Sequence, residues 1–321
     1  MAVYTEVTTE QLEAFLQDYD VGSATSLKGL IEGVENTNYF LSTEAGDYIL
    51  TLYEQRVDAD DLPFFMDLLE HLGAKDYPCP PPIKNLRGEG LAMLAGRPAA
   101  LFPFLLGVST TSPSTKHCRQ IGAYLAKMHL ACADFRKPWR KNSMGAVGWN
   151  TLFVSCRDAA EGVAVGLENQ IQGVLDAVAT GWPKDLPTGI CHGDLFPDNV
   201  LFTGTKVTGV IDFYFACEEL LIYDLAVTLN AWSISPYGSF YYSNSRAILQ
   251  GYQEHRPISA AERDVFLLML RAASVRFLLT RIYDWVNTPK DAVVKRKDPM
   301  EYVRALRLHL KQDSPTFYGF D

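Results

Sequence analysis

One short segment, residues 190–213, constrains this chain of 321 residues more than any other. It begins Ile-Cys-His-Gly-Asp-Leu-Phe-Pro-Asp-Asn and continues as two apolar stretches, which are joined by a turn at residues 203–206. Asp194 and Asn199 stand in the pattern His-x-Asp-x4-Asn, and the second apolar stretch ends at Asp212. Two apolar stretches around a Gly-containing turn predict a β-hairpin, and this hairpin would bring Asp212 beside Asn199.

These polar residues suit phosphoryl transfer. The reaction needs metal ions to neutralise the phosphate oxygens and a carboxylate to take the proton of the attacking hydroxyl. Asp194 is the candidate base, and the side-chain oxygens of Asn199 and Asp212 are hard ligands of the kind that Mg²⁺ prefers. The competing interpretation is that Asp194 caps a turn and Asp212 ends a strand, but it leaves the spacing unexplained. The segment therefore predicts an ATP- and Mg²⁺-dependent kinase that acts on a hydroxyl group.

Two further polar residues are expected to support the loop. His192 is assigned to holding it by hydrogen bonds, because the carboxylate two residues later is the better base. Asp224 follows in the string Ile-Tyr-Asp-Leu-Ala, twelve residues after Asp212. We expect Asp224 to anchor the loop through backbone hydrogen bonds, and direct contact with the substrate is the alternative.

The surrounding sequence predicts an α+β fold with two lobes. Residues 25–56 and 91–106 read as strands separated by Gly-containing turns. A capping box at Thr8 and Gln11 predicts a first helix over residues 9–19. The other expected helices are at 60–72, 114–131, 158–179, 245–254, 260–286 and 298–311. We therefore expect a small antiparallel β-sheet lobe in residues 1–105 and a larger, mainly helical lobe in residues 106–321.

The N-terminal lobe contains candidates for nucleotide binding. Residues 29–38 contain two glycines, and glycine lets backbone N–H groups approach phosphates closely. The candidate phosphate-covering residues are Gly33, Asn36, Thr37 and Asn38. In the apolar stretch that joins the lobes, the residues expected to enclose an adenine ring are Phe102, Phe104 and Leu105. Ordinary core packing is the alternative interpretation of this stretch.

Composition narrows the class of protein. The formal net charge of −9 makes nucleic acid a poor partner, because an acidic surface repels phosphates. The six cysteines are scattered, without a Cys-x-x-Cys pair, and this spacing favours reduced thiols over zinc ligands or disulfides. The N-terminus lacks the pattern of a signal peptide. The sequence contains no run of about 18 apolar residues, so we expect no membrane span. We expect a cytoplasmic protein, and the sequence leaves its oligomeric state open.

At these residues the chain resembles the aminoglycoside-phosphotransferase and choline-kinase-like family, which has a protein-kinase-like fold. The string His-Gly-Asp-Leu-Phe-Pro-Asp-Asn is typical of the whole family. Strings at residues 33–40, 48–53, 121–130 and 210–217 are more similar to its homoserine kinase branch. The resemblance implies that ATP phosphorylates L-homoserine to O-phospho-L-homoserine, a step toward threonine. It implies Asp194 as the base, Asn199 and Asp212 as Mg²⁺ ligands, and residues 33–38 as the nucleotide loop.

Two positions depart from the kinase pattern. Kinases of this fold usually carry a Lys on the third strand, which contacts the phosphates and pairs with a helical Glu. Thr51 stands at the place of the Lys, and Phe65 stands near the place of the Glu. Homoserine kinases of this type share the Thr, so catalysis is still expected. The group that replaces the Lys is unassigned, and a non-catalytic nucleotide-binding protein is the alternative.

A zwitterionic substrate would need a cation for its carboxylate, and a carboxylate or carbonyl groups for its ammonium. The candidates are Tyr214 and Glu218, which closely follow Asp212, and Arg276 on a predicted helix. Choline, a sugar or an aminoglycoside are alternative substrates of the same chemistry. Choline would call for an aromatic cage, and an aminoglycoside would call for many carboxylates.

Overall fold

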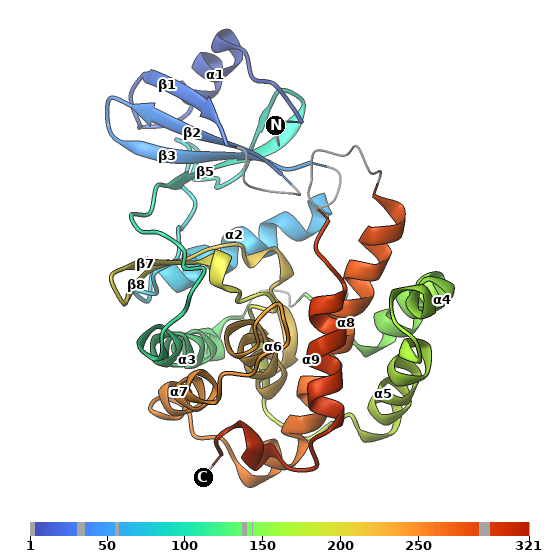
Figure 1. The fold of residues 1–321 in the computed structure, drawn as a ribbon. Helices are drawn as coiled ribbons and strands as arrows, with labels where there is room; N and C mark the ends of the chain where they lie inside the picture. Colours follow the sequence, from blue (N-terminus) through green and yellow to red (C-terminus); the bar gives the residue numbers. More distant parts are fainter. Residues whose placement is uncertain are drawn as a thin grey trace. The chain divides into compact units, whose positions relative to one another are not determined.

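The computed structural model describes residues 4–30, 36–54, 58–136, 140–142, 144–288 and 296–320 (Figure 1). The chain divides into two compact units. The first unit comprises Met1–Gly107, Phe135–Trp139 and Thr208–Tyr214. The second comprises Val108–Asp134, Arg140–Val207 and Phe215–Asp321. Two short segments from later in the sequence thus belong with the N-terminal part of the chain.

The first unit contains a five-stranded sheet in the order β1-β2-β3-β5-β4. Its strands are β1 (Ala24–Gly29), β2 (Thr37–Thr43), β3 (Asp47–Leu52), β4 (Ala92–Leu94) and β5 (Arg97–Pro103). Every pair of neighbours is antiparallel. Short turns join β2 to β3 and β4 to β5, whereas β3 and β5 are far apart in the sequence. The helices of this unit are α1 (Thr9–Leu16) and α2 (Leu62–Gly73), and a 3₁₀ turn at Ala59–Asp61 precedes α2.

The first helix begins at the predicted capping box. The Thr8 hydroxyl accepts the Gln11 N–H at 3.2 Å, and the Gln11 side chain accepts the Thr8 N–H at 3.0 Å. These two bonds satisfy donors that a helix start leaves without partners. The helix buries Leu12, Phe15 and Leu16 in a core shared with leucines of β2, β3 and β5. The predicted helix over residues 9–19 therefore exists, although it ends at Leu16.

The remaining elements are mainly helical. The helices are α3 (Thr115–Ala131), α4 (Ala146–Val163), α5 (Leu167–Gly181), α6 (Leu221–Ser233), α7 (Tyr242–Gln253), α8 (Ala260–Asn287) and α9 (Met300–Leu310). The short strands are β6 (Thr188–Cys191), β7 (Val200–Thr203), β8 (Lys206–Val210) and β9 (Cys217–Leu220), which pair as β6 with β9 and β7 with β8. Short 3₁₀ turns lie at Cys132–Asp134, Pro197–Asn199, Phe213–Phe215 and Pro315–Tyr318. The α+β expectation is met, and the hairpin predicted around residues 203–206 is present.

Two helical predictions need correction. The single helix expected at 158–179 is two helices, α4 and α5, because the chain breaks at Gly166, whose φ of 75° is left-handed. Helix α6 was not predicted. All but one of its 13 residues are buried, so it lacks the polar face that produces a helical period in the sequence.

Helices α3 and α7 pack with their backbones in close approach. A Cβ atom added to Gly122 would lie 2.0 Å from the carbonyl oxygen of Ile248, and one added to Gly251 would lie 2.0 Å from that of Arg119. Only glycine fits at these two positions without a shift of the helices.

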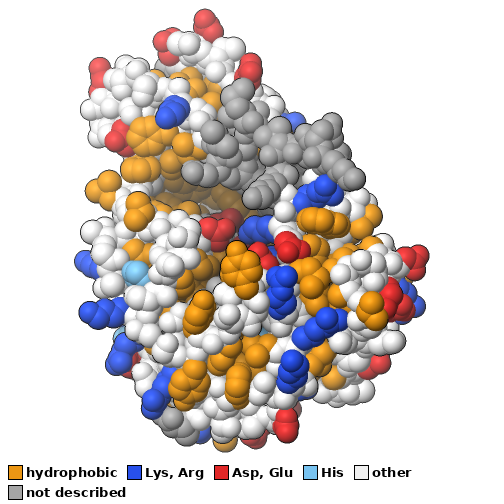
Figure 2. All heavy atoms as spheres, viewed as in Figure 1, with side chains coloured by type: hydrophobic (Ala, Val, Ile, Leu, Met, Phe, Trp, Pro, Cys, Tyr) orange, Lys and Arg blue, Asp and Glu red, His pale blue; other side chains and the backbone are white. Residues whose placement is uncertain are grey.

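Over the helical unit, hydrophobic side chains on the face shown in Figure 2 form small groups between basic and acidic ones. Within the described residues, no helix is long and apolar enough to cross a membrane.

Candidate active site

The segment from His192 to Asn199 forms a loop between β6 and β7. Gly193 begins it in the left-handed conformation, with φ of 73°. A Cβ atom at this position would lie 2.9 Å from the carbonyl oxygen of Phe215. Both the backbone angle and the lack of space therefore require glycine before Asp194.

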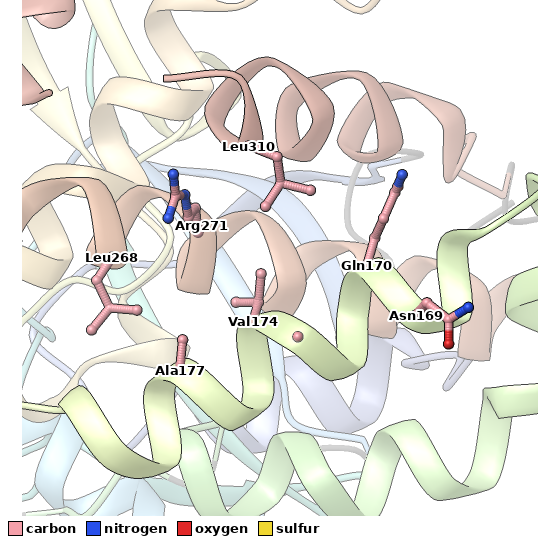
Figure 3. Close-up of a pocket in the computed structure, with 8 residues that line it drawn as sticks. Asn169, Gln170, Val174, Ala177, Leu268, Arg271 and Leu310 are labelled. Carbon is pink, nitrogen blue, oxygen red and sulfur yellow. The ribbon is translucent and has the colours of Figure 1, made fainter. Parts of the chain in front are cut away.

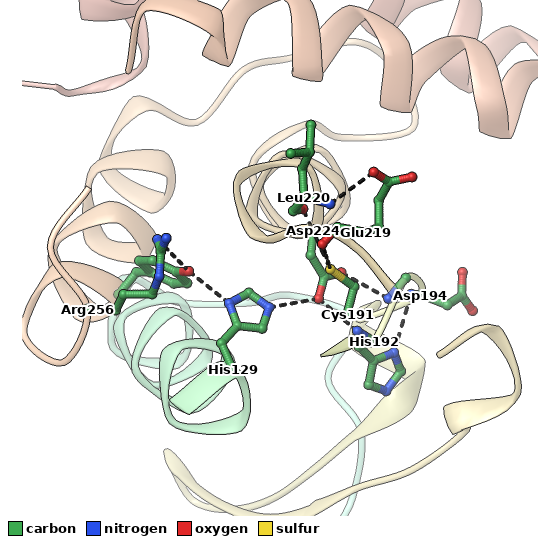
Figure 4. Close-up of polar contacts among 10 residues, drawn as sticks. His129, Cys191, His192, Asp194, Glu219, Leu220, Asp224 and Arg256 are labelled. Carbon is green, nitrogen blue, oxygen red and sulfur yellow. Dashed lines mark hydrogen bonds and ion pairs between the residues drawn. The ribbon is translucent and has the colours of Figure 1, made fainter. Parts of the chain in front are cut away.

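Asp224, on α6, holds this turn through hydrogen bonds to the backbone (Figure 4). Its carboxylate is fully buried and accepts the backbone N–H groups of His192 at 2.7 Å and of Gly193 at 2.9 Å. The backbone hydrogen bonds expected of Asp224 are therefore present. Burial alone would raise the pKa of Asp224. The hydrogen bond and charge of His129, the nearby His192 and the Gly193 N–H outweigh burial and lower that pKa, so the carboxylate is ionised.

A buried polar chain continues from Asp224 to α7. His129 Nε2 lies 3.1 Å from the Asp224 carboxylate, and its Nδ1 lies 2.8 Å from the Tyr252 hydroxyl. Arg256 donates to that hydroxyl at 3.2 Å and to Glu262 at 2.7 Å. Figure 4 shows His129 between Asp224 and Arg256 in this row of hydrogen-bonded side chains. His129 is a site residue that sequence reasoning missed, because it stands 95 residues before its partner.

Asp194 and Asn199 contact each other within the loop. The Asn199 amide nitrogen donates to the backbone oxygen of Asp194 at 2.8 Å and to its carboxylate at 3.1 Å. Both hydrogen bonds use the NH₂ group, so the amide oxygen is the atom of Asn199 that suits a hard cation. His192 is buried, and its Nδ1 accepts the Asp194 N–H at 3.3 Å. The loop's own side chains therefore fix the backbone on both sides of Asp194.

The Asp194 carboxyl group is less acidic than an ordinary aspartate. Burial raises its pKa to about 6, and repulsion from Asp198 adds to the rise. The cations Arg276 and Lys297 and the hydrogen bond from Asn199 oppose it. A carboxylate with a pKa near 6 is largely ionised at pH 7 and is a stronger proton acceptor than an exposed aspartate. These are the properties that a general base needs.

Arg276 supports the loop from α8. Its side chain is buried, and its guanidinium donates to the carbonyl oxygen of Gly193. The guanidinium also lies over the rings of Phe277, at 4.2 Å, and Phe215, at 5.3 Å. Sequence reasoning offered Arg276 as a cation for the substrate carboxylate. The structure gives it three partners, the Gly193 carbonyl oxygen and the two rings, and its contact with a substrate stays a prediction.

Asp212 and Tyr214 belong to the first unit, whereas Asn199 belongs to the second. Asp212 has a left-handed φ of 64°, a conformation that is uncommon for a residue with a side chain and is enriched at active sites. The Tyr214 hydroxyl lies 3.1 Å from that of Tyr53, and the Tyr214 ring also packs edge-on against Phe65. The expected proximity of Asp212 to Asn199 stays a prediction.

Glu218, on β9, is exposed and lies opposite Ile190 of β6. Its backbone N–H donates to the carbonyl oxygen of Arg140 at 2.8 Å. Its predicted contact with a substrate stays a prediction, as does that of Tyr214.

The candidate nucleotide residues are in part described. Gly33 lies outside the described residues. Asn36 accepts the Glu54 N–H at 3.3 Å, and the Thr37 hydroxyl donates to the Glu54 carboxylate at 2.8 Å. The hydroxyl of Thr51 donates to Asn38 at 2.8 Å across the β2–β3 pair. The position usually held by Lys is thus a buried Thr that fixes Asn38.

The stretch predicted to contact adenine begins at the end of β5 and continues past it. Phe102 is buried, Leu105 is half-buried and Phe104 is exposed. The Phe104 ring packs edge-on against Phe40, with ring centres 5.1 Å apart, and its N–H donates to the Asp47 carbonyl oxygen at 3.1 Å. Phe102 fits the core-packing alternative, whereas Phe104 is accessible to a ligand.

A separate pocket of about 400 Å³ lies among α5, α8 and α9 (Figure 3). Its lining includes Gln170, Val174 and Leu268. The guanidinium of Arg271 at its edge donates to the carbonyl oxygens of His309 and Gln312, so it serves to end α9. None of the predicted site residues lines this pocket.

The chain can be compared with known proteins. The model of the phosphotransferase enzyme family matches residues 26–258. This match covers well over half of the chain, which therefore belongs to that family.

Curated relatives and solved structures agree with the family match. The chain is 51% identical to the homoserine kinase of Acidiphilium cryptum (strain JF-5), across 99% of this chain and 100% of that protein. It is 49% identical to the homoserine kinase of Xanthobacter autotrophicus (strain ATCC BAA-1158 / Py2), across 99% of both. An amicoumacin kinase solved in complex with AMP-PNP, Ca²⁺ and Ami has a TM-score of 0.69 at 14% identity, over 97% of this chain and 94% of that one. A spectinomycin phosphotransferase solved with ADP and spectinomycin also has a TM-score of 0.69 at 14% identity, over 95% and 98%. These likenesses confirm the predicted protein-kinase-like fold.

Proposed function

We propose that this chain is a homoserine kinase, which transfers the γ-phosphoryl group of ATP to the hydroxyl of L-homoserine and gives ADP and O-phospho-L-homoserine. The observation that carries the proposal is the end-to-end similarity, at 51%, 49% and 50% identity, to homoserine kinases of three bacteria. Fold alone would not select this substrate, because kinases of the same fold act on many alcohols. The six buried free thiols support a reducing compartment, and we place the enzyme in the cytoplasm.

Asp194 is the proposed general base. The homoserine oxygen attacks the γ-phosphorus, its proton passes to the Asp194 carboxylate, and the bond from the γ-phosphorus to the β–γ bridging oxygen breaks to leave ADP. The raised pKa of Asp194, about 6, supports this assignment. The fixed backbone on either side of Asp194 supports it too, since alignment of the reacting atoms supplies much of the rate.

Asn199 and Asp212 are the proposed Mg²⁺ ligands. An amide oxygen and a carboxylate are the donors that a hard cation takes, and the Asn199 hydrogen bonds use only its NH₂ group. When bound, Mg²⁺ supplies positive charge against the phosphate oxygens. Residues 33–38 and 102–105 are proposed to bind the nucleotide, with the side chains of Asn36 and Thr37 fixing the start of β2 against Glu54.

The test is ADP release with Mg²⁺ and ATP against L-homoserine, L-serine, L-threonine, choline and kanamycin. We expect strong turnover on L-homoserine alone. Turnover on a different alcohol would keep the kinase and reject the substrate.

The alternative, a non-catalytic nucleotide-binding protein, is motivated only by the Thr at position 51, where kinases of this fold usually carry a Lys. ATP binding without turnover on any alcohol in the panel would support that candidate and reject the kinase.

A further inference from the structure

The proposed substrate carries a carboxylate, so its site needs a cation. Two cations lie at the loop that carries Asp194: Arg276 donates to the carbonyl oxygen of Gly193, and the Lys297 ammonium lies 3.8 Å from the Asp198 carboxylate. They differ in how their charged groups are engaged. This difference decides between them, because a group that binds a substrate has to be accessible.

Arg276 is not available to a ligand. Only 4% of its surface is exposed, and its guanidinium donates to the Gly193 carbonyl oxygen. The same group lies over two aromatic rings. A substrate carboxylate could reach it only by displacing the support of the residue that precedes Asp194.

Lys297 has the opposite character. Its side chain is 62% exposed, and its ammonium lies 3.8 Å from the carboxylate of Asp198, which is itself 65% exposed. The ammonium also lies 5.8 Å from the centre of the Phe196 ring. Phe196 and Asp198 are two and four residues after Asp194, so Lys297 lies over the catalytic loop. Its charged end is open to solvent.

The surroundings of Lys297 are held by ring packing and by a hydrogen bond. The Phe196 ring packs edge-on against Phe277, with centres 4.9 Å apart, and Phe277 stacks on Tyr302 at 5.2 Å. The next residue, Asp298, is held at its carbonyl oxygen by Arg281 at 3.0 Å. The ring nearest the Lys297 ammonium and the backbone that follows Lys297 are therefore both held in place, an arrangement that lowers the entropy lost when a ligand binds.

We infer that Lys297 binds the α-carboxylate of the amino-acid substrate, and that Arg276 is a positioning residue of the loop. The inference rests on the proposed function, and it adds the residue that selects an amino acid over a simple amino alcohol. The exposed ion pair with Asp198 does not prevent this role. Pairs as exposed as this one contribute little to stability, so the ammonium can turn to a substrate carboxylate at small cost.

The experiment compares two alcohols on two proteins. L-Homoserine carries the carboxylate, whereas 3-aminopropan-1-ol has the same spacing between hydroxyl and amine but lacks it. The Lys297→Gln variant should raise KM for L-homoserine by about tenfold or more, because it removes a charged hydrogen-bond donor. Its KM for ATP should stay close to that of the unmodified protein, and kcat/KM should fall much further for L-homoserine than for 3-aminopropan-1-ol, which has no carboxylate for Lys297 to bind. Lys297→Arg should keep most of the affinity for L-homoserine.

The matched control is Arg296→Gln, which removes the same charge one residue away. Arg296 donates to the carbonyl oxygen of Trp285 at 2.8 Å and lies over the Trp285 ring, away from the loop contacts of Lys297. The Arg296→Gln substitution should therefore leave all these constants unchanged. An unchanged KM for L-homoserine in Lys297→Gln would overturn the inference, and so would an equal loss on both alcohols. Failure of the proposed function has a different signature, because the unmodified protein would then not turn over L-homoserine at all.

Discussion

The anchoring of the loop by Asp224 predicts the effect of a substitution that changes only one heavy atom. In Asp224→Asn, one carboxylate oxygen becomes an NH₂ group of nearly the same size. The amide oxygen can take the place of the carboxylate oxygen that bonds His129 and accepts the His192 N–H. The NH₂ group then faces the Gly193 N–H, where a carboxylate oxygen lay at 2.9 Å. Two donors meet, and a buried N–H loses its acceptor.

The expected loss of stability follows from these contacts. A buried donor without an acceptor costs about 1–3 kcal/mol, and each of the two remaining bonds loses about 1 kcal/mol with the loss of the charge. We therefore expect a decrease of about 3–5 kcal/mol in the free energy of unfolding at pH 7.5, measured by urea denaturation. Because the pKa of Asp224 is lowered by folding, its contribution is present above the unfolded value of about 3.9 and is lost as pH falls through the folded value.

The matched control is Asp264→Asn, an exposed residue on α8 that should change stability by less than about 0.5 kcal/mol. A change of less than about 1 kcal/mol in Asp224→Asn would refute the reasoning, because the three hydrogen bonds would then not hold the loop.

Two further predictions concern packing and charge. Gly122→Ala should destabilise the protein by about 1–3 kcal/mol or more, because the new Cβ would meet a carbonyl oxygen of α7, whereas Gly173→Ala on α5, with open space around it, should stabilise by about 1 kcal/mol. Equal effects in urea denaturation would contradict the close approach of α3 and α7. Asp194 has a pKa raised to about 6, so its ionisation opposes folding above that pH. Without metal, Asp194→Asn should be more stable than the unmodified protein by about 2–3 kcal/mol at pH 7.5, and the difference should vanish as pH falls from 6 to 4. A difference independent of pH would refute the raised pKa.

Local signals predicted much of the fold. The capping box at Thr8 and Gln11 located the start of α1, because both of its hydrogen bonds are formed within one turn. The glycine-containing turn at residues 203–206 located the β7–β8 hairpin. Helix α6 was not predicted because it is buried on nearly all sides. The break between α4 and α5 was not predicted because it depends on a single left-handed glycine.

The candidate site was predictable within the loop and for Asp224, whose backbone hydrogen bonds to the loop were expected. The spacing of Asp194 and Asn199 is local, and the structure shows their contact. The partnership of Asp224 with His129 and that of Gly193 with Arg276 join distant segments, and no sequence pattern indicates them. The sequence does not distinguish an arginine that is buried against aromatic rings from one that is accessible to a substrate. For Arg276, only burial and contacts in the structure make this distinction.

The most direct test of the central claim compares the unmodified protein with Asp194→Asn, using L-homoserine, ATP and Mg²⁺. Formation of O-phospho-L-homoserine is followed by phosphorus NMR, and kcat by ADP release. The account predicts that the unmodified protein makes this product and that the variant loses about 10²–10⁴-fold in kcat, the share that a general base supplies, while its affinity for ATP is retained. Near-normal turnover by Asp194→Asn, or no phosphohomoserine from the unmodified protein, would contradict it.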